Sequence, residues 1–566
     1  MRLLRVFIDG YRNLRNAEAR FDKGSLTTVV IGENGAGKSN LIEAIAEVFR
    51  AYDFGEQARI GFTYEIVYRT RAYDVCLSNR ADAPDRPPEF FREASTGDED
   101  DRLRIDLRKL IDSRRSAIRS YHLPDFVFGY YSGSGRRLER LFDGHQARYY
   151  GVINKERTDE EYAEAARARR LFYCRPIHGV LALLTYFARP GRESDVRTLL
   201  TEKLGITGFH SALAHFKEPS WFSNSLWQKG RHSEARAAGK GRRTYDKLGE
   251  QAWDVWGARG PAGSCARTFR DIGFHPLTLA GKVVDDYRHK PKTEAQLACF
   301  LRDKAALDRL AKAYETDQDM FAALEAADIS DLFREMIVWV TRTSDASGDI
   351  SFSDLSDGER QLLMVLGLIR VSRGREALFL LDEPDTHLNP AWQLTYLDLI
   401  RDWTEVAADE ESCQIVMTSH NPLTIAALIK KEVRVMQALE DGQVNVSEPY
   451  ADPRGMGFTS TLTEIFGLPT TLDPATQHKI DERNRLARLK SRNEEQEREL
   501  IALNDRLDRL GFMHESRDPL YDDFLKAVHD VKYADRPLMT QDQIEKRRLA
   551  MQMLIRSLID EQGAAH

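Results

Sequence analysis

A glycine-rich segment close to the N-terminus has the residue types and spacing of a phosphate-binding loop. Residues 32–39 (G-E-N-G-A-G-K-S) match the pattern G-x-x-x-x-G-K-S and lie between an apolar strand and an amphipathic helix. Glycines let backbone N–H groups curl around a β-phosphate, and the helix N-terminus adds its positive end. We expect Lys38 to reach the β- and γ-phosphates of ATP and the Ser39 hydroxyl to bind Mg²⁺. The other candidate nucleotide contacts of this segment are Asn34, Gly35, Gly37 and Asn40.

A pair of acidic residues far along the chain has the spacing of a magnesium ligand and a general base. Four apolar residues, 378–381, run directly into Asp382 and Glu383. We expect Asp382 to hold Mg²⁺, directly or through water, and Glu383 to polarise the attacking water. Buried strands often end in an acid, so this pattern alone does not identify a catalytic site. The motifs near it in the sequence make it specific.

One of these neighbours is a histidine at the end of the next predicted strand. Residues 418–420 read T-S-H and follow the apolar run 414–418. A lone histidine is more often structural, but the carboxyl ends of parallel strands form the ligand crevice of such sheets. We therefore expect His420 to sense the γ-phosphate and to orient water together with Glu383.

The segment 355–361 (L-S-D-G-E-R-Q) precedes the acidic pair and is followed by an apolar helix. It resembles the signature of ABC (ATP-binding-cassette) ATPases, LSxGE[KR]Q, and His420 resembles the switch histidine of that family. The resemblance implies that Ser356 and Gly358 contact a γ-phosphate bound to the opposite protomer, with the helix dipole aimed at it. Glu359 is a further candidate contact. An ordinary serine helix cap would explain the segment alone, but not its order with the acidic pair.

The separation of the two halves distinguishes the chain from transporter cassettes. Lys38 and Ser356 lie more than three hundred residues apart, which resembles the RecF/SMC/OLD-like branch of ABC ATPases. The phrase 382–390 is similar to the OLD-like form DEPExxLxP, although Asp385 and Asn389 depart from its usual Glu and His. Short phrases at 130–138, 459–468 and 517–521 look like those of the ATPases of Septu and retron defence systems.

These resemblances imply partners as well as an activity. The tail carries no D-x-D pair after a strand, as a Toprim nuclease would need, and no HNH-type metal cluster. The family likeness therefore implies an ATP- and Mg²⁺-dependent head dimer, with higher oligomers open, that regulates a separate HNH nuclease subunit in anti-phage defence. It also suggests a reverse transcriptase with its msDNA-type nucleic acid. A DNA-repair ATPase is one alternative. Another is a self-contained ribonuclease built on Glu515, Arg517, Asp518 and His529.

Three further features are weaker. Arg12 and Asn13, in the turn after the first strand, resemble the basic turn by which related heads contact nucleotide, although a surface arginine is the simpler explanation. A Q-loop glutamine is not identifiable, because the strand at 125–131 has no Gln. Basic residues with nearby aromatics crowd 227–247 and form either a solvated loop or a phosphate-tracking patch.

The elements that must position these residues predict an α/β fold. Apolar runs of strand length alternate with amphipathic helices in both motif-bearing segments, and residues 61–77 look like an antiparallel pair. We predict an ABC-ATPase head, a P-loop sheet with an antiparallel β-subdomain, interrupted by a mostly helical insertion. The expected segments are residues 1–157 and 346–450 for the two halves of the head, 158–345 for the insertion and 451–566 for a helical, partner-binding tail.

Composition excludes several classes of protein. The 566 residues carry a net charge of −7, so the chain as a whole is not a basic nucleic-acid binder. Five separated cysteines without a C-x-x-C pair argue against a zinc site or a disulfide framework and fit a cytoplasmic location. The longest apolar stretch, residues 179–188, is too short to span a membrane, and the N-terminus is unlike a signal peptide.

Overall fold

The structure is a computed structural model in which two compact units, residues 1–469 and 470–566, are each described by themselves. It describes residues 1–70, 73–80, 89–94, 103–104, 122–189, 199–223, 245–284, 288, 290–343, 347–348, 350–372, 375–406, 413–468, 472–487, 489 and 493–509. The basic stretch at 227–247 lies almost wholly outside the described residues, and so do the phrase 517–521 and the alternative ribonuclease centre.

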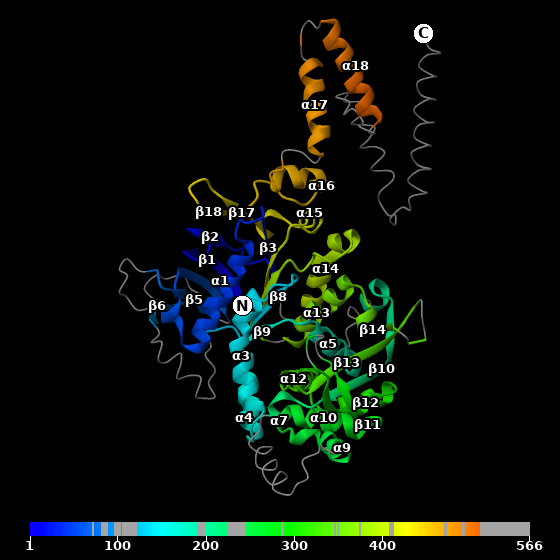
Figure 1. Cartoon of the computed structure of the whole chain (residues 1–566). Coiled ribbons are helices and arrows are strands. Elements are labelled where there is room, and N and C mark those ends of the chain that lie inside the picture. Colours follow the sequence, from blue (N-terminus) through cyan, green and yellow to red (C-terminus); the bar gives the residue numbers. More distant parts are fainter. Residues whose placement is uncertain are drawn as a thin grey trace. The chain divides into compact units, whose positions relative to one another are not determined.

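A seven-stranded sheet forms the centre of the first unit (Figure 1). Its order is β18 (Val444–Ser447), β17 (Val433–Ala438), β3 (Thr27–Gly32), β16 (Cys413–Thr418), β15 (Ala377–Asp382), β8 (Phe126–Tyr131) and β9 (Leu171–Tyr173). All neighbours are parallel except β17 and β18. Every residue of β3, β15 and β16 is buried, which explains their unbroken apolar runs. The predicted α/β fold with a parallel sheet is confirmed.

Helices cover both faces of this sheet, because successive side chains of a strand point to opposite faces. Val30, Leu378 and Leu380 pack into one core, with α1 (Lys38–Phe54) and α3 (Arg137–Ile153). The intervening residues, such as Val29 and Phe379, pack into a second core. This second core contains α5 (Pro176–Ala188), α13 (Asp357–Val371) and α14 (Pro390–Val406).

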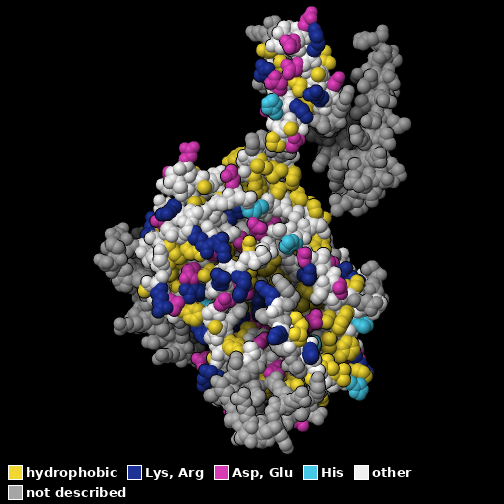
Figure 2. Space-filling view, viewed as in Figure 1, with side chains coloured by type: hydrophobic (Ala, Val, Ile, Leu, Met, Phe, Trp, Pro, Cys, Tyr) yellow, Lys and Arg dark blue, Asp and Glu magenta, His cyan; other side chains and the backbone are white. Residues whose placement is uncertain are grey.

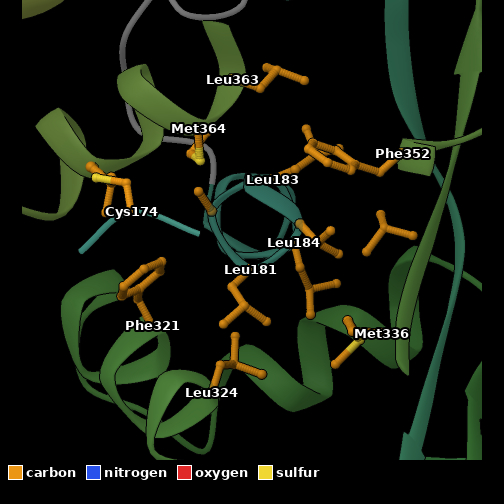
Figure 3. Close-up of a cluster of buried hydrophobic side chains, with 14 of the residues drawn as sticks. Cys174, Leu181, Leu183, Leu184, Phe321, Leu324, Met336, Phe352, Leu363 and Met364 are labelled. Atoms are coloured by element: carbon orange, nitrogen blue, oxygen red, sulfur yellow. The ribbon is translucent and has the colours of Figure 1, made fainter. Parts of the chain in front are cut away.

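Helix α5 is the buried centre of the second core. Figure 3 views it end on, with Leu181, Leu183 and Leu184 pointing outward into a shell of apolar side chains. The shell includes Phe321, Leu324, Met336, Phe352, Leu363 and Met364. The longest apolar stretch of the sequence is therefore a core helix. Among the helices of the described residues, none combines the length and apolar character needed to cross a bilayer.

A second sheet, antiparallel and six-stranded, completes the head as predicted. Its order is β2 (Ala17–Arg20), β1 (Arg2–Asp9), β4 (Thr63–Thr70), β5 (Tyr73–Ser78), β6 (Glu89–Ala94) and β7 (Leu103–Arg104). The predicted antiparallel pair at 61–77 corresponds to β4 and β5.

The insertion differs from the mostly helical block that its sequence predicted. Its helices are α4 (Asp159–Arg167), α7 (Ser220–Ser223), α9 (Tyr245–Trp253), α10 (Gly260–Ile272), α11 (Lys304–Ala311) and α12 (Asp317–Ile329). Beside them lies a five-stranded antiparallel sheet in the order β11 (Phe274–Val283), β12 (Lys292–Leu301), β10 (Ile206–Lys217), β13 (Phe333–Arg342) and β14 (Ile350–Ser351).

Two physical reasons explain why this sheet was missed. In β12 the buried Leu297 and Cys299 alternate with Ala298 and Phe300, which are also apolar. The alternation of polar and apolar residues that indicates a strand is therefore absent from the sequence. Edge strand β11 is largely exposed, and hydrophobic side chains are visible over this region in Figure 2. The predicted boundary at 157/158 is also corrected, because β9 and α5 belong to the head's sheet and core.

The remaining elements are short, apart from those of the second unit. In the first unit they are α15 (Pro422–Ile425), α16 (Gly457–Ser460) and the helical turns η1 (Gln57–Arg59), η3 (Leu199–Lys203), η4 (Val255–Gly257), η5 (Phe352–Asp354), η6 (Lys430–Glu432) and η7 (Thr461–Ile465). In the second unit, α17 (Pro474–Ala487) and α18 (Glu494–Arg509) pack against each other and bury Leu486, Leu503 and Leu507. These leucines close a helical hairpin within the tail that the sequence predicted to be helical.

Candidate nucleotide-binding site

The phosphate loop connects the buried strand β3 to the first turn of α1, and two of its glycines have no substitute. Gly32 has φ +148°, and a Cβ there would lie 2.2 Å from the carbonyl oxygen of Met436 on β17. Gly37 has φ +101°, and a Cβ there would lie 2.7 Å from the Leu14 side chain. Both conformations are strained for residues with a side chain. The motif is therefore required by the path of the backbone as well as by phosphate chemistry.

Lys38 is buried at the centre of the loop. Its ammonium donates hydrogen bonds of 2.8 Å to the carbonyl oxygens of Gly32 and Glu33. Burial lowers the pKa of Lys38 to about 8, although the nearby carboxylates of Glu383 and Asp382 oppose the shift. The lysine therefore lies close to both the loop carbonyls and the acidic pair.

Ser39 and Asp382 come together from opposite halves of the sequence. The Ser39 hydroxyl donates to Asp382 Oδ1 over 3.1 Å, and the Thr418 hydroxyl donates to the same oxygen over 2.5 Å. Burial raises the pKa of Asp382, and these hydrogen bonds limit the rise. A carboxylate and a hydroxyl are hard oxygen donors of the kind Mg²⁺ prefers. The two residues fit the magnesium role assigned to them.

Glu383 faces His420 across the carboxyl edge of the sheet. His420 Nε2 lies 3.2 Å from Glu383 Oε1, and the hydrogen bond between them lowers the pKa of Glu383. Glu383 has φ +54°, and its backbone N–H donates to the Thr418 hydroxyl over 3.0 Å. A non-glycine residue in this conformation is strained, which often marks a functional position. The carboxylate is ionised and held beside an imidazole, as a general base requires.

The register of the sheet explains how these residues meet. Asp382 on β15 pairs with Thr418 on β16 and with Tyr131 on β8, and Thr418 pairs with Val30 on β3. The carboxyl ends of these four strands therefore lie side by side, and the loops after them carry the candidate residues. Tyr131 was not predicted as a site residue, and it occupies the region where a Q-loop was sought.

The departures from the OLD-like phrase have local explanations. The Asp385 carboxylate is buried and accepts hydrogen bonds of 2.6 Å from the hydroxyls of Ser419 and Thr424. The Asn389 side chain accepts from the backbone N–H of Trp392 at the start of α14, as a helix cap does. Asp385 thus fixes the loop after β15 to the loop after β16, next to His420.

Arg12 and Asn13 lie at the mouth of the phosphate loop, together with Asn40. The Asn13 amide donates to the Gly35 carbonyl over 2.5 Å and accepts from Asn40 over 2.6 Å. Arg12 forms an ion pair of 2.9 Å with Glu43 on α1. Arg137, at the start of α3, was not predicted; it pairs with Glu43 at 3.1 Å and donates to Asn40 over 2.6 Å. Only its basic phrase at 136–137 hinted at it.

The signature segment forms the first turn of α13. Ser356 and Glu359 form a capping box, in which the Ser356 hydroxyl and backbone N–H both donate to the Glu359 carboxylate. Gly358 is buried, and a Cβ there would lie only 2.7 Å from the His387 carbonyl oxygen, so a larger residue would not fit without a shift. Glu359 also pairs with Arg342. Ser356 itself is exposed on the surface of the protomer.

Comparison with known proteins gives one family model and two curated relatives. The model described as "AAA domain, putative AbiEii toxin, Type IV TA system" matches residues 297–426, which include the signature, the acidic pair and His420. The chain is 28% identical over 162 residues to the Septu protein PtuA of Bacillus mycoides (strain KBAB4), covering 27% of this chain and 22% of that protein. It is 29% identical over 181 residues to the Septu protein PtuA of Bacillus thuringiensis, covering 29% and 43%. The match therefore spans less than half of either relative.

The solved structures that align with this chain include an Smc head and RecF. The Smc head of Pyrococcus furiosus bound to the C-terminal domain of ScpA aligns over 79% of this chain and 96% of its own, with 15% identity and a TM-score of 0.31. RecF with ATP aligns over 79% and 97%, with 12% identity and a TM-score of 0.24. Because both scores are low, the fold assignment depends on the sheet order and loop geometry described above.

Proposed function

We propose that this chain, which is similar to the Septu protein PtuA, is an ABC-type ATPase that hydrolyses ATP with Mg²⁺. It acts in the cytoplasm as a head dimer and controls a separate HNH-type nuclease in anti-phage defence. One observation carries the hydrolysis: the ionised Glu383 faces His420 beside the Asp382–Ser39 pair, which adjoins the phosphate loop. A general base, a magnesium site and a phosphate cradle are therefore contiguous.

Each residue has a distinct chemical task in this proposal. Lys38 and the loop amides bind the β- and γ-phosphates, while Ser39 and Asp382 hold Mg²⁺, which neutralises charge on the phosphates when it is bound. Glu383 accepts the proton of the attacking water, and His420 orients the carboxylate through its 3.2 Å contact. Thr418 keeps Asp382 and Glu383 in register, since it bonds to both.

Dimerisation supplies the remaining contacts. The exposed Ser356 and the first turn of α13 present a hydroxyl and the positive end of the helix at the protein surface, which suits a phosphate held by a second copy. ATP would join two heads through two such composite sites, and hydrolysis would release them. The similarity to the Septu protein PtuA supports a defence role. The separate HNH nuclease is the partner that the resemblance of the sequence motifs implies. A retron-like variant would add a reverse transcriptase with its msDNA.

The test of hydrolysis is Glu383→Gln. We expect ATP turnover to fall by at least about a hundredfold while ATP binding remains, because only the base is lost. Turnover is measured by phosphate release, and bound ATP by equilibrium dialysis. Glu440→Gln, an exposed glutamate after β17, is the matched control. Retained turnover in Glu383→Gln would refute the assignment of the base.

The partner proposal is tested separately from hydrolysis. The full-length chain is co-expressed with the products of its neighbouring genes and purified through a tag. Stable copurification of an HNH protein supports the defence function. Its absence, together with DNA-stimulated ATP turnover, would favour the DNA-repair alternative. Ribonuclease activity of the chain alone, abolished by His529→Ala, would favour the self-contained alternative.

A further inference from the structure

Strand β11 forms one edge of the insertion's sheet, since β12 is its one neighbour among the strands that the structure describes. The backbone groups along the other side of an edge strand are open to pairing with a further strand, and proteins usually protect such an edge with charges, prolines or short strands. Pro276 lies in the irregular part of β11. Residues 277–283 then form a regular ladder with β12, and Lys282 is the only charged residue among them. Seven positions of this edge are therefore weakly protected.

The two faces of the sheet differ at β11. Thr278 pairs with the fully buried Leu297 and lies against Gly249 of α9, so helices cover this face. Leu277 and Leu279 point to the opposite face, because successive side chains of a strand alternate. Both leucines are exposed, at 58% and 45%.

Apolar side chains continue across this open face. Phe274 pairs with Phe300 on β12, Phe300 with Leu213 on β10, and Leu213 with Ile337 on β13. Directly paired residues share a face, so the four side chains form a row across four strands. Each of them is exposed or partly exposed, and hydrophobic surface is visible in this region in Figure 2. The weakly protected edge therefore borders an apolar surface.

A second copy of this chain has the matching edge. Two antiparallel strands can pair around a twofold axis, and the midpoint of residues 277–283 is Ala280. Pairing around Ala280 places Leu277 of one copy opposite Val283 of the other, and Leu279 opposite Gly281. A Cβ on Gly281 would meet no atom within 4 Å, which leaves space for the second copy's Leu279. The edge is thus complementary to itself in both its backbone and its open-face side chains.

The apolar area also suits a contact between two copies. Phe274, Leu277, Leu279 and Val284 are each about half exposed. With about 150–200 Å² for a fully exposed side chain of this size, they offer roughly 300 Å² per copy. A standard interface buries about 800 Å² per partner, of which a little more than half is apolar. These four side chains can therefore supply most of the apolar part of such an interface.

We propose that β11 is a self-association surface, at which two copies pair antiparallel around Ala280 and join their five-stranded sheets into one continuous sheet. This contact needs no nucleotide. It also lies away from the signature, because β14 is the opposite edge of the sheet and the adjacent β13 ends at Arg342, which pairs with Glu359. One copy can therefore use both contacts at once. If the head dimer proposed above forms, ATP converts β11 dimers into larger assemblies.

The first test is sedimentation velocity of the full-length, nucleotide-free chain at about 1–50 µM. We expect a dimer with Kd below about 10 µM. Combining Leu277→Lys with Leu279→Lys should raise this Kd at least about tenfold, because four ammonium groups would then meet at an apolar contact. Leu394→Lys on α14 is the matched control, since Leu394 is exposed to the same extent as Leu279, and it should leave the Kd unchanged.

Disulfide crosslinking tests the register. Ala280→Cys places a thiol opposite the same thiol of the second copy, at a Cα separation of about 4.5–5.5 Å that a disulfide can bridge. Thr278→Cys lies on the same strand, but four residues, or about 13 Å, separate it along the ladder from its counterpart. Under mild oxidation Ala280→Cys should form a covalent dimer. Thr278→Cys should behave as the parent chain, which already contains five cysteines.

Three results would each overturn the proposal. The nucleotide-free chain could be monomeric throughout the concentration range, which would leave the edge to a strand of another protein. The paired lysine substitutions could leave the Kd unchanged, or Thr278→Cys could crosslink as readily as Ala280→Cys. These measurements use no ATP, so their failure is distinct from a failure of the ATPase proposal. Conversely, a β11 dimer that does not grow when Glu383→Gln protein binds ATP would count against the head dimer alone.

Discussion

The charge on Lys38 couples nucleotide binding to pH. Burial lowers its pKa to about 8, so the ammonium loses its proton above that pH in the nucleotide-free protein. Bound phosphates favour the charged form and raise the pKa again. Binding of ATP with Mg²⁺ above pH 8 must therefore take up a proton. We expect the affinity to fall by up to about tenfold per pH unit there, and to be independent of this group well below pH 8.

Calorimetry in buffers of different ionisation enthalpy measures this proton uptake directly. Close to one proton should be taken up per ATP near pH 9, and almost none near pH 6.5. The exposed Lys312→Ala is the control variant and should keep both values. Equal uptake at the two pH values would contradict the assignment of the titration to Lys38.

At the scale of single residues, short motifs predicted a set of side chains that the structure brings close together. Lys38, Ser39, Asp382, Glu383 and His420 lie together as their spacing implied. The supporting contacts were not predictable in the same way. Two such contacts join residues far apart in sequence: Asp385 with Thr424, and Arg137 with Glu43. No sequence motif identifies either pair.

Elements of the insertion are tied to the head through one buried carboxylate. Glu325 on α12 pairs with Arg169 at 2.7 Å, just before β9, and with His178 on α5 at 3.3 Å. Burial alone would raise the pKa of Glu325, but the Arg169 charge and the His178 hydrogen bond outweigh it and lower the pKa to about 2. The ionised carboxylate therefore stabilises the junction between three elements.

We predict that Glu325→Gln lowers the free energy of unfolding by about 3–5 kcal/mol at pH 7, because Arg169 keeps a buried charge without its partner. The folded pKa lies below the ordinary value of 4.5, so the carboxylate's contribution is complete above that pH. It is lost as the pH falls toward 2, and the difference between variant and parent should shrink accordingly. Urea unfolding at several pH values measures it. Exposed Glu335→Gln is the control, and an equal loss in both variants would refute the prediction.

The predictability of an element depended on how fully it is buried. Strands β3, β15 and β16 are buried throughout, and their unbroken apolar runs were recognised. The antiparallel sheet of the insertion was not, because apolar residues occupy both faces of β12 and most of β11 is exposed. Pairing partners for such strands are decided by packing between distant segments, which a local pattern does not contain.

For the whole molecule, the proposed dimer predicts complementation between two inactive variants. Lys38→Ala disables the phosphate loop, and Ser356→Arg blocks the exposed signature surface. Each site in the proposed dimer combines Lys38 of one copy with Ser356 of the other. A dimer of one Lys38→Ala copy and one Ser356→Arg copy therefore has one site in which both residues are intact. Mixing the variants should therefore restore up to about a quarter of the parental ATP turnover, since half of the random dimers are mixed and each has one of two sites.

The complementation experiment has two sets of controls. Each single variant is assayed alone, and a variant that carries both Lys38→Ala and Ser356→Arg is mixed with the parent protein. Each single variant should be inactive at all concentrations, and activity of the mixture should rise with total protein. If Lys38 and Ser356 served the same site of one protomer, the mixture would stay inactive. Light scattering with ATP and Mg²⁺ reports the dimer independently of turnover.

The strand order of the central sheet also has a consequence for how the protein is made. Strand β3, which comes early in the chain, lies between β16 and β17, and β15 lies between β16 and the early strand β8. During synthesis, strand β3 and the phosphate loop leave the ribosome before the insertion does. They therefore remain without the neighbouring strands β16 and β17 until the insertion has been made. Such long-range pairing is slow and exposes strand edges. A chain that stops before β16 lacks Thr418 and His420. It therefore has no complete candidate nucleotide site, and an early-arrested product should be inert.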